Sequence, residues 1–394
     1  MSERLKIGVM GLVRGNFVLT SALGLEDQMV VSAVCETNDE LIESQRKFFA
    51  PVTKVYKDFD EFINSGLDGV VLCNYFHEHV KYAIKAMEAG VPVLSETTAA
   101  PSLGECIDLV EAYERTGTKY MLAANCPYYK PVHAMKEKIE KGEYGKVLYA
   151  EAEYIHPSAM NNVKVPDPQN LHWRQTLPNC YYNMHTLGPL MYITGSVPTK
   201  VTAKAVCADM PSKLTNTFKT FNLTEMDSGA VFCTTGSVNK GLGGKWYRVN
   251  CEEGIMESVR EDWELNLLQE IGPLDTCRKT WHSFASSGSI TKEEETKYSA
   301  AIAKSGHGGI DFILMLEFLK VLRGEKEIFF DVYRSAALSA AGILSWYSIL
   351  DNSKEYIIPD FRDKQAREVF RGDYRTPFAK RLEDITLPYR LDRT

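Results

Sequence analysis

Short apolar runs alternate with helical patterns over the first third of the chain, and this alternation restricts the possible folds more than any other feature. The runs occupy residues 5–10, 29–34, 54–56, 69–73, 91–95 and 120–123. Apolar strands separated by helices are typical of a parallel sheet that is covered on both faces. The sequence therefore predicts an α/β fold with a doubly wound, Rossmann-type sheet over residues 1–125.

The first strand ends in a glycine turn, Gly11-Leu12-Val13-Arg14-Gly15-Asn16, and a helical pattern follows it. Such a turn lets the backbone approach a pyrophosphate at a helix N-terminus, where N–H groups and the helix dipole favour negative charge. The match to GxGxxG is incomplete, because Val13 and Asn16 stand at two of the three glycine positions. Taken alone, the turn is a weak signal for dinucleotide binding.

An acidic residue, Glu36, follows the second strand at about the expected distance beyond the glycine turn. A carboxylate there can accept hydrogen bonds from a ribose 2′-OH and would repel a 2′-phosphate. Glu36 therefore favours NAD over NADP. The alternative interpretation is a solvated acid that happens to follow a strand.

Ligands of doubly wound sheets bind at the carboxyl ends of the strands. The loops at these ends define one predicted nucleotide crevice. Its expected cofactor-binding residues are Gly11, Leu12, Arg14, Gly15, Asn16, Glu36, Asn74, His79, Glu96 and Asn125.

The pattern changes after residue 125, where we place the start of a second domain that runs to residue 394. Strand-like runs at 146–156, 200–207, 229–235 and 245–251 follow one another without helices between them. They predict an α+β domain with a large, open, mostly antiparallel sheet. We expect a polar loop or lid at 286–305, helices at 310–322 and 332–350 with Asp331 as a helix N-cap, and a tail at 352–394 that wraps the domain or lies at a subunit contact.

Proton-transfer groups are concentrated in residues 179–189, where Tyr182 and His185 stand three positions apart just before an apolar run. On a helix these two residues share a face. A neutral imidazole can accept a proton near neutral pH, and a phenol can donate or relay one. Period two places Tyr154 and His156 on one face of a strand. The alternative for His185 is a hydrogen-bonded core histidine.

Composition excludes several classes of partner. The chain has 394 residues, a net charge of −7 and no basic run, which argues against nucleic acids and anionic membranes. Its nine cysteines are scattered and include no CxxC pair, so we expect reduced thiols and neither a disulfide framework nor a metal site. No leader is visible in the given sequence and no apolar run approaches 18 residues, from which we expect a cytoplasmic protein.

Several motifs, in order along the chain, carry a resemblance to a known family. In the first domain the segment AMEAGVPVLSET at 86–97 is similar to the Gfo/Idh/MocA oxidoreductases. The chain more closely resembles the NAD-dependent glycoside hydrolase family 109, of the α-N-acetylgalactosaminidase type. The motifs are EYIH at 153–156, HWR at 172–174, YYNMHTLGP at 181–189, GHGGIDF at 306–312, DVYRSA at 331–336 and IPDF at 358–361.

The resemblance implies an enzyme that keeps NAD bound and acts on a small-molecule glycoside. The sugar C3 hydroxyl would be oxidised, the C2 proton removed, the C1 substituent eliminated, water added and the ketone reduced again. Tyr154, Tyr182 and His185 would be catalytic. Substrate-binding residues would be His156, Trp173, Arg174 and His307, although a turn cap is the alternative for His307. The resemblance also implies a homo-oligomer, a dimer or tetramer.

Two departures from the family pattern leave alternatives open. The triplet Glu96-Thr97-Thr98 stands where dehydrogenases of the wider family have Glu-Lys-Pro, and Ala124 stands where the glycosidases usually have an acid. The first departure favours a glycosidase, whereas the second leaves the glycoside open. A sugar or glycoside 3-dehydrogenase that releases a 3-keto product is the main alternative, and a nucleotide-binding sensor without turnover is the other.

Overall fold

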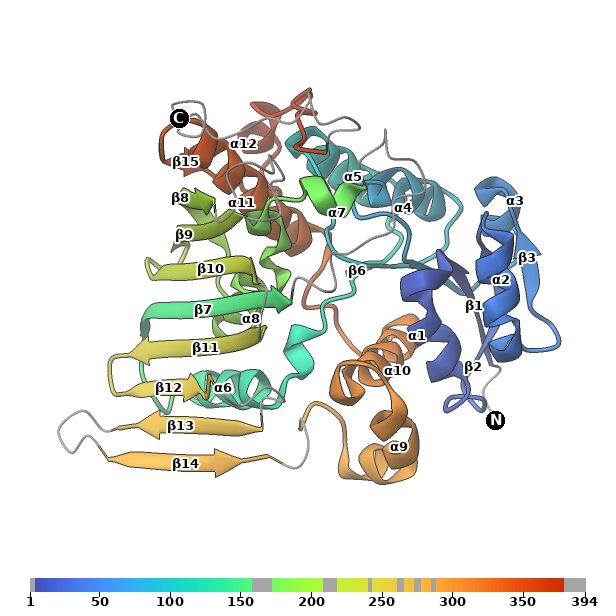
Figure 1. The fold of residues 1–394 in the computed structure, drawn as a ribbon, viewed down its shortest axis with the longest axis horizontal. Coiled ribbons are helices and arrows are strands. Elements are labelled where there is room, and N and C mark those ends of the chain that lie inside the picture. The colour runs from blue at the N-terminus through green and yellow to red at the C-terminus, as the bar shows by residue number, and fades with distance from the viewer. Residues whose placement is uncertain are drawn as a thin grey trace. The chain divides into compact units, whose positions relative to one another are not determined.

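The computed structural model describes residues 4–157, 172–207, 218–239, 243–260, 266–272, 278–284 and 288–378. The chain forms two units, each with its own sheet (Figure 1). Unit 1 comprises Met1–Ala100, Glu105–Tyr128 and Ile290–Ala336, and unit 2 comprises Pro101–Gly104, Tyr129–Ser289 and Ala337–Thr394. The expected division at residue 125 differs from this one, because residues 290–336 cluster with the nucleotide-binding part of the chain.

Unit 1 contains a six-stranded sheet in which every pair is parallel. Its strands are β1 (Leu5–Met10), β2 (Met29–Cys35), β3 (Lys54–Tyr56), β4 (Gly69–Leu72), β5 (Val93–Ser95) and β6 (Tyr120–Leu122). The spatial order β3-β2-β1-β4-β5-β6 reverses between β1 and β4. This reversal is the point at which doubly wound sheets bind dinucleotides, and the predicted fold class is confirmed.

Helices connect these strands, and local capping explains where several of them begin. They are α1 (Leu12–Ala22), α2 (Asp39–Gln45), α3 (Phe59–Ile63), α4 (His79–Glu88) and α5 (Leu103–Thr116), with short 3₁₀ turns η1 (Arg46–Phe48) and η2 (Cys126–Tyr128). The side chains of Asn38 and Asp58 accept backbone N–H bonds at the starts of α2 and α3. Helix α1 has no such side-chain cap.

Residues 290–336 join unit 1 because their helices bury apolar side chains in it. Helix α10 (Ile310–Arg323) packs on α1. At Gly69 of β4 a Cβ atom would lie 2.9 Å from the Leu322 side chain, so this helix also approaches the sheet closely. The burial of α10 against α1 and β4 is a long-range effect that the local pattern does not contain.

The prediction of a polar loop at 286–305 is wrong over most of its length, because residues Lys292–Lys304 form helix α9. Thr291 and Glu294 form a reciprocal capping box at its start. Acidic residues fill its first turn and Lys304 lies in its last, which complements the helix dipole. Tyr298 is the buried anchor of an otherwise polar helix.

Unit 2 contains a nine-stranded sheet in the order β14-β13-β12-β11-β7-β10-β9-β8-β15. Strands β7 and β10 pair in parallel and all other neighbours are antiparallel. The strands are β7 (Val147–Pro157), β8 (Pro198–Cys207), β9 (Phe218–Met226), β10 (Val231–Asn239), β11 (Gly244–Cys251), β12 (Ile255–Ser258), β13 (Leu267–Ile271), β14 (Lys279–Ser283) and β15 (Tyr356–Ile357). The expected mostly antiparallel sheet is confirmed.

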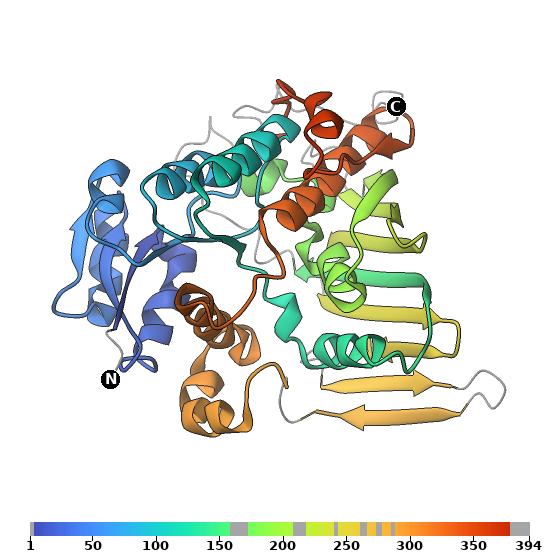
Figure 2. The ribbon, with the colours of Figure 1, turned by 180° about the vertical axis from the view of Figure 1, so that it is seen from behind.

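One face of this sheet is covered by helices. Figure 2 shows α6 (Lys130–Glu140) and α8 (Leu187–Thr194) in front of the strands, and α8 contacts β7, β10 and β11. Strand β9 has buried Thr220, Asn222 and Thr224 alternating with the exposed Phe221 and Leu223. The period of two therefore separates a helix-covered face from an open one.

The last part of the described chain begins with α11 (Val332–Leu350), which matches the expected helix. Asp331 Oδ1 accepts the backbone N–H of Arg334 at 2.8 Å, so the predicted N-cap is confirmed. Strand β15 then adds to the edge of the unit 2 sheet beside β8, and α12 (Lys364–Glu368) follows. The predicted tail beyond residue 378 lies outside the described residues.

No helix within the described ranges is long and apolar enough to cross a membrane. In the same ranges no group of three or more His, Cys, Asp or Glu side chains could hold a metal ion.

Seven cysteines whose surroundings the structure describes are free thiols, and six of them are buried. We predict that titration under denaturing, non-reducing conditions finds close to nine free thiols, because the cysteines are odd in number and scattered along the chain. Detection of a single free thiol in such a titration would contradict this prediction.

Candidate active site

The predicted dinucleotide turn lies tightly against the neighbouring strands. Gly11 has φ 83°, and a Cβ atom there would lie 2.6 Å from the carbonyl oxygen of Cys73 after β4. A Cβ at Gly15 would lie 2.6 Å from a methyl group of Val9 in β1. Both positions therefore require glycine, as a turn that brings backbone N–H groups close to a pyrophosphate does.

The carboxylate of Glu36 lies at the N-terminus of α1, beside the glycine turn. Its Oε2 accepts the backbone N–H of Leu12 at 3.0 Å, and its Oε1 accepts those of Thr37 and Asn38 at 2.8 and 3.0 Å. These bonds use three of about four acceptor positions of a carboxylate. The acid is thus held in a fixed orientation at the place where a ribose-binding acid is expected.

The loop after β4 contributes an amide suited to a nucleotide. Both polar atoms of the Asn74 side chain, Nδ2 and Oδ1, are buried and have no hydrogen-bond partner among the residues that the structure describes. Buried polar groups are nearly always paired, so these two atoms are candidates for contact with a bound ligand. Together with the closely packed glycine turn before α1 they fit a dinucleotide.

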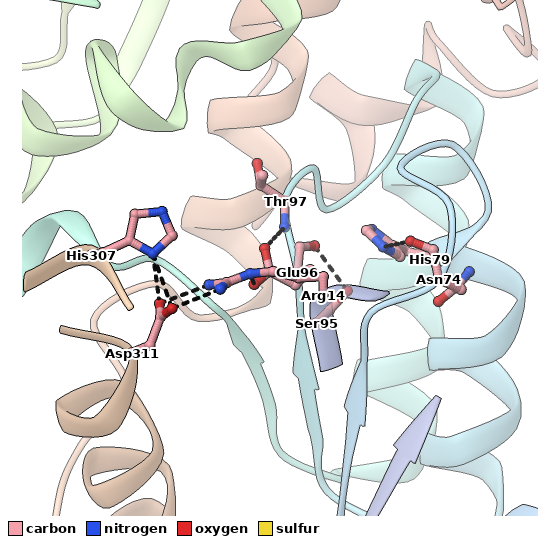
Figure 3. A network of polar contacts seen from close by, with 8 residues as sticks. All are labelled: Arg14, Asn74, His79, Ser95, Glu96, Thr97, His307 and Asp311. Carbon is pink, nitrogen blue, oxygen red and sulfur yellow. Dashed lines mark hydrogen bonds and ion pairs between the residues drawn. The ribbon is translucent and has the colours of Figure 1, made fainter. Parts of the chain in front are cut away.

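His79 bonds two backbone carbonyls of unit 1, as in the structural role that is its alternative, and its expected contact with the cofactor stays a prediction. It is 1% exposed, and its Nδ1 lies 2.9 Å from the carbonyl oxygen of Thr98. Its Nε2 lies 3.3 Å from the carbonyl oxygen of Asn74 (Figure 3). Burial lowers its pKa, so the neutral imidazole donates one N–H to the backbone. His79 joins the loop after β4 to the loop after β5.

Asn16 and Asn125, two further predicted cofactor-binding residues, form hydrogen bonds within unit 1. The side-chain amide of Asn16 donates to Gln45 of α2. Asn125 follows β6, is buried, and accepts the backbone N–H of Tyr128 through its carbonyl. Their contact with the nucleotide stays a prediction.

Arg14 and Glu96 form an ion-pair network that the sequence did not reveal (Figure 3). Arg14 bonds Glu96 through Nε and Asp311 through both terminal nitrogens. His307 Nδ1 lies 3.1 and 3.0 Å from the two carboxylate oxygens of Asp311. Asp311 was missed; its only sequence signal is its spacing four residues after His307 in the GHGGIDF motif.

Unit 2 brings the predicted proton-transfer residues together in one aromatic cluster. The rings of Tyr154 and His185 are stacked with centroids 4.5 Å apart, and those of Tyr182 and His185 are 4.8 Å apart. His156 lies at the edge of the cluster, 6.0 Å from Tyr154 and 6.1 Å from Tyr182. Tyr154 and His156 extend from β7, as the period of two predicted.

Tyr182 and His185 were expected to lie on one helix, and they lie on a 3₁₀ helix, η4 (Asn179–His185), which has a kink at Tyr182. The two residues still share a face, because residues three apart eclipse in this tighter helix. His185 is 7% exposed, and its carbonyl accepts a hydrogen bond of 3.1 Å from Tyr247 of β11. The Asn183 side chain donates to the Leu338 carbonyl of α11 at 2.7 Å, which fixes the same segment.

Burial, and to a lesser extent the neighbouring Tyr182, raises the pKa of Tyr154 well above its usual value, while Arg174 lowers it. Tyr154 is therefore a neutral phenol near neutral pH and can donate a proton. The cluster combines two phenols with an imidazole that can accept one. Such a set can move protons at a bound alcohol or at an acidic C–H group.

Trp173 and Arg174 form the start of the short helix α7 (Trp173–Thr176), which is capped by the His172 side chain. The Arg174 guanidinium lies 4.5 Å from the centre of the Trp173 ring. Because its charge acts on Tyr154, Arg174 is within electrostatic reach of the cluster. The predicted substrate contacts of these two residues stay predictions.

A dinucleotide turn on a Rossmann sheet and a buried set of proton-transfer groups define an NAD-dependent enzyme. Residues 5–124 match the oxidoreductase family with an NAD-binding Rossmann fold, Gfo/Idh/MocA. Residues 246–367 match the C-terminal domain of glycosyl hydrolase family 109. These two matches confirm the resemblance to the Gfo/Idh/MocA oxidoreductases and to glycosyl hydrolase family 109, together with the enzyme class and the cofactor expected from the sequence.

Similar proteins extend along most of the chain. An α-N-acetylgalactosaminidase of Tannerella forsythia is 24% identical, covering 87% of this chain and 83% of the relative. A glycosyl hydrolase family 109 protein of Stenotrophomonas maltophilia is 24% identical, covering 94% and 92%. Among solved structures, levoglucosan dehydrogenase in complex with NADH and levoglucosan has a TM-score of 0.71 at 17% identity, covering 91% of this chain and 100% of that one.

Proposed function

We propose that the protein is an NAD-dependent glycosidase that cleaves a glycoside through transient oxidation at sugar C3. The observation that carries this proposal is the buried cluster of Tyr154, Tyr182 and His185, in which an imidazole and two phenols lie within 6 Å of one another, centre to centre. The relatives named as family 109 proteins, one of them an α-N-acetylgalactosaminidase, support the choice of a glycoside as substrate.

NAD bound at the glycine turn would supply the acceptor for the C3 hydride and the source of hydride for the final reduction. His185 accepts the proton of the C3 hydroxyl as the ketone forms, releases it to solvent, and then accepts the proton of C2. The C2 electron pair forms a double bond to C1 while the C1–O bond breaks, and a neutral phenol gives the leaving oxygen its proton. Water adds at C1, C2 regains a proton, and C3 and its oxygen regain a hydride and a proton, so the net reaction is a redox-neutral hydrolysis.

The ketone is what makes the C2 proton accessible to a side chain. A C–H group beside an alcohol is too weakly acidic for an imidazole, whereas one beside a carbonyl comes within reach of a positioned base. Transient oxidation therefore makes elimination possible with the groups present in the cluster. We further propose that His156, Trp173, Arg174 and His307 contact the sugar or its substituent.

The end of β5 supports a glycosidase over a dehydrogenase that releases its product. Thr97 follows Glu96 there, and its hydroxyl cannot take the place of the lysine ammonium with which ordinary dehydrogenases of the wider family move the proton of the oxidised hydroxyl. The backbone N–H of Thr97 donates to Glu96 at 3.4 Å. Proton transfer then depends on the cluster of unit 2.

We predict that turnover of an aryl glycoside in D₂O places deuterium at C2 of the released sugar. Absorbance at 340 nm should stay constant while sugar is released, because the hydride returns in each cycle. Mass spectrometry of the product and the absorbance trace check both expectations. Stoichiometric NADH would show a 3-dehydrogenase, and released sugar without deuterium at C2 would point to direct displacement and contradict the mechanism.

A further inference from the structure

Arg14 stands on the first turn of α1, directly after Gly11, where the sequence predicts a contact with the cofactor. Each of its three side-chain nitrogens donates a hydrogen bond to a carboxylate of unit 1. Nε lies 2.7 Å from Glu96 Oε1, and the two terminal nitrogens lie 2.7 and 2.8 Å from the two oxygens of Asp311. The guanidinium also lies 4.3 Å from the centre of the Phe17 ring. A bidentate, stacked arginine of this kind is held in one orientation.

Asp311 is the more deeply buried partner, since only 2% of its side chain is exposed, against 31% for Arg14. Burial alone would raise the pKa of Asp311, but hydrogen bonds and charge from Arg14 and His307 hold this pKa well below its usual range. Asp311 is therefore ionised. Loss of Arg14 would leave a buried carboxylate paired with His307 alone, which is strongly destabilising for its surroundings.

The turn at residues 306–309 depends on the position of this carboxylate. His307 has φ 53°, and Gly308 and Gly309 follow with φ 68° and 97°. A left-handed residue other than glycine is uncommon, and the contact of His307 with the carboxylate four residues later stabilises this conformation. At Gly306 a Cβ atom would lie 2.4 Å from Asp311 Oδ2, so the backbone of the turn also packs on the carboxylate.

We propose that Arg14 is a positioning residue and does not bind the cofactor pyrophosphate. On one side its guanidinium fixes the carboxylate of Glu96 at the end of β5. On the other it fixes Asp311, and through Asp311 the turn that presents His307 (Figure 3). The role of His307 at the substrate rests on the proposed function, whereas the positioning of its turn does not.

The test uses Arg14→Gln, Arg14→Lys and Asp311→Asn in the full chain, with Arg46→Gln as a matched control. Arg46 is an exposed arginine of unit 1 that pairs with Glu43 at the surface. Two measurements require no sugar turnover. Calorimetry gives the NAD dissociation constant, and hydrogen exchange with mass spectrometry gives the protection of residues 305–311, where the amides of Gly309 and Asp311 both donate to Gly306.

We expect Arg14→Gln to speed exchange in residues 305–311 by about tenfold or more, because the contact that closes the turn is lost. Asp311→Asn should do the same. Arg14→Lys should restore this protection only in part, since an ammonium cannot bridge two carboxylates in a fixed fork. The NAD dissociation constant should change by less than about threefold in all of them, and Arg46→Gln should leave both quantities unchanged.

An NAD dissociation constant about tenfold or more weaker in Arg14→Gln would overturn the proposal, because it would show a cofactor contact. Unchanged exchange in residues 305–311 would also overturn it, whatever the NAD affinity. If Arg14→Gln does not fold, the same two measurements on Arg14→Lys test the proposal, because lysine keeps the positive charge beside the buried carboxylate of Asp311. The expected NAD dissociation constants and hydrogen-exchange rates do not depend on the proposed glycosidase function, so they stay the same if that function is wrong.

Discussion

Replacement of His185 by alanine should lower glycoside turnover by about 10²–10⁴-fold, the range typical for removal of a positioned base. The imidazole packs against both Tyr154 and Tyr182 and is buried, so solvent cannot replace it readily as a proton acceptor. NAD affinity should stay within a few-fold of the unmodified protein, because His185 belongs to unit 2 and the dinucleotide turn to unit 1. Steady-state kinetics and calorimetry measure the two effects.

The variant Tyr182→Phe tests the contribution of the Tyr182 hydroxyl separately from that of its aromatic ring. The phenylalanine keeps the packing against His185 and His156 but removes the proton donor, so turnover should fall without loss of the fold. The matched control is His133→Gln, because His133 is a half-buried histidine of the same unit that contacts Tyr192 and lies outside the cluster. Full activity in His185→Ala would remove the catalytic role given to this segment.

Replacement of Glu36 by arginine should weaken NAD binding by roughly 10–100-fold and improve NADP binding, since a hydrogen bond to a charged group contributes about 1.5–3 kcal/mol. The carboxylate lies at the start of α1, where it can accept from a ribose 2′-OH and repels a 2′-phosphate. Dissociation constants for both dinucleotides, measured by calorimetry on the same preparations, test the expected reversal.

Glu36→Gln is the control for the backbone hydrogen bonds that the carboxylate also accepts. Leu12, Thr37 and Asn38 all donate to Glu36, and a glutamine carbonyl can replace part of this set without the charge. The glutamine variant should bind NAD less tightly than the unmodified protein and more tightly than the arginine variant. NADP found tightly bound to the unmodified protein would defeat the assignment.

Local patterns in the sequence determine most of the elements of this protein, although not α9, and much of its chemistry. The alternation of apolar runs with helices predicts the parallel sheet, because strands buried on both faces have to be continuously apolar. The glycine turn and Glu36 predict NAD, since both act within one βαβ unit. Tyr154 and His156 could be placed on one face of a strand because the period of two is a property of the backbone alone.

Tertiary structure decides which distant segments meet. Arg14 and Asp311 are 297 residues apart, and nothing near either residue indicates that the two form a bidentate pair. For the same reason the sequence could not place residues 290–336 in unit 1, where α10 buries its apolar side chains on α1. It also could not show that Tyr154 of β7 stacks on His185 of η4, or that the Tyr247 hydroxyl bonds the His185 carbonyl. Periodicity reports which face of an element is buried, whereas the partner of that face depends on the packing of the whole chain.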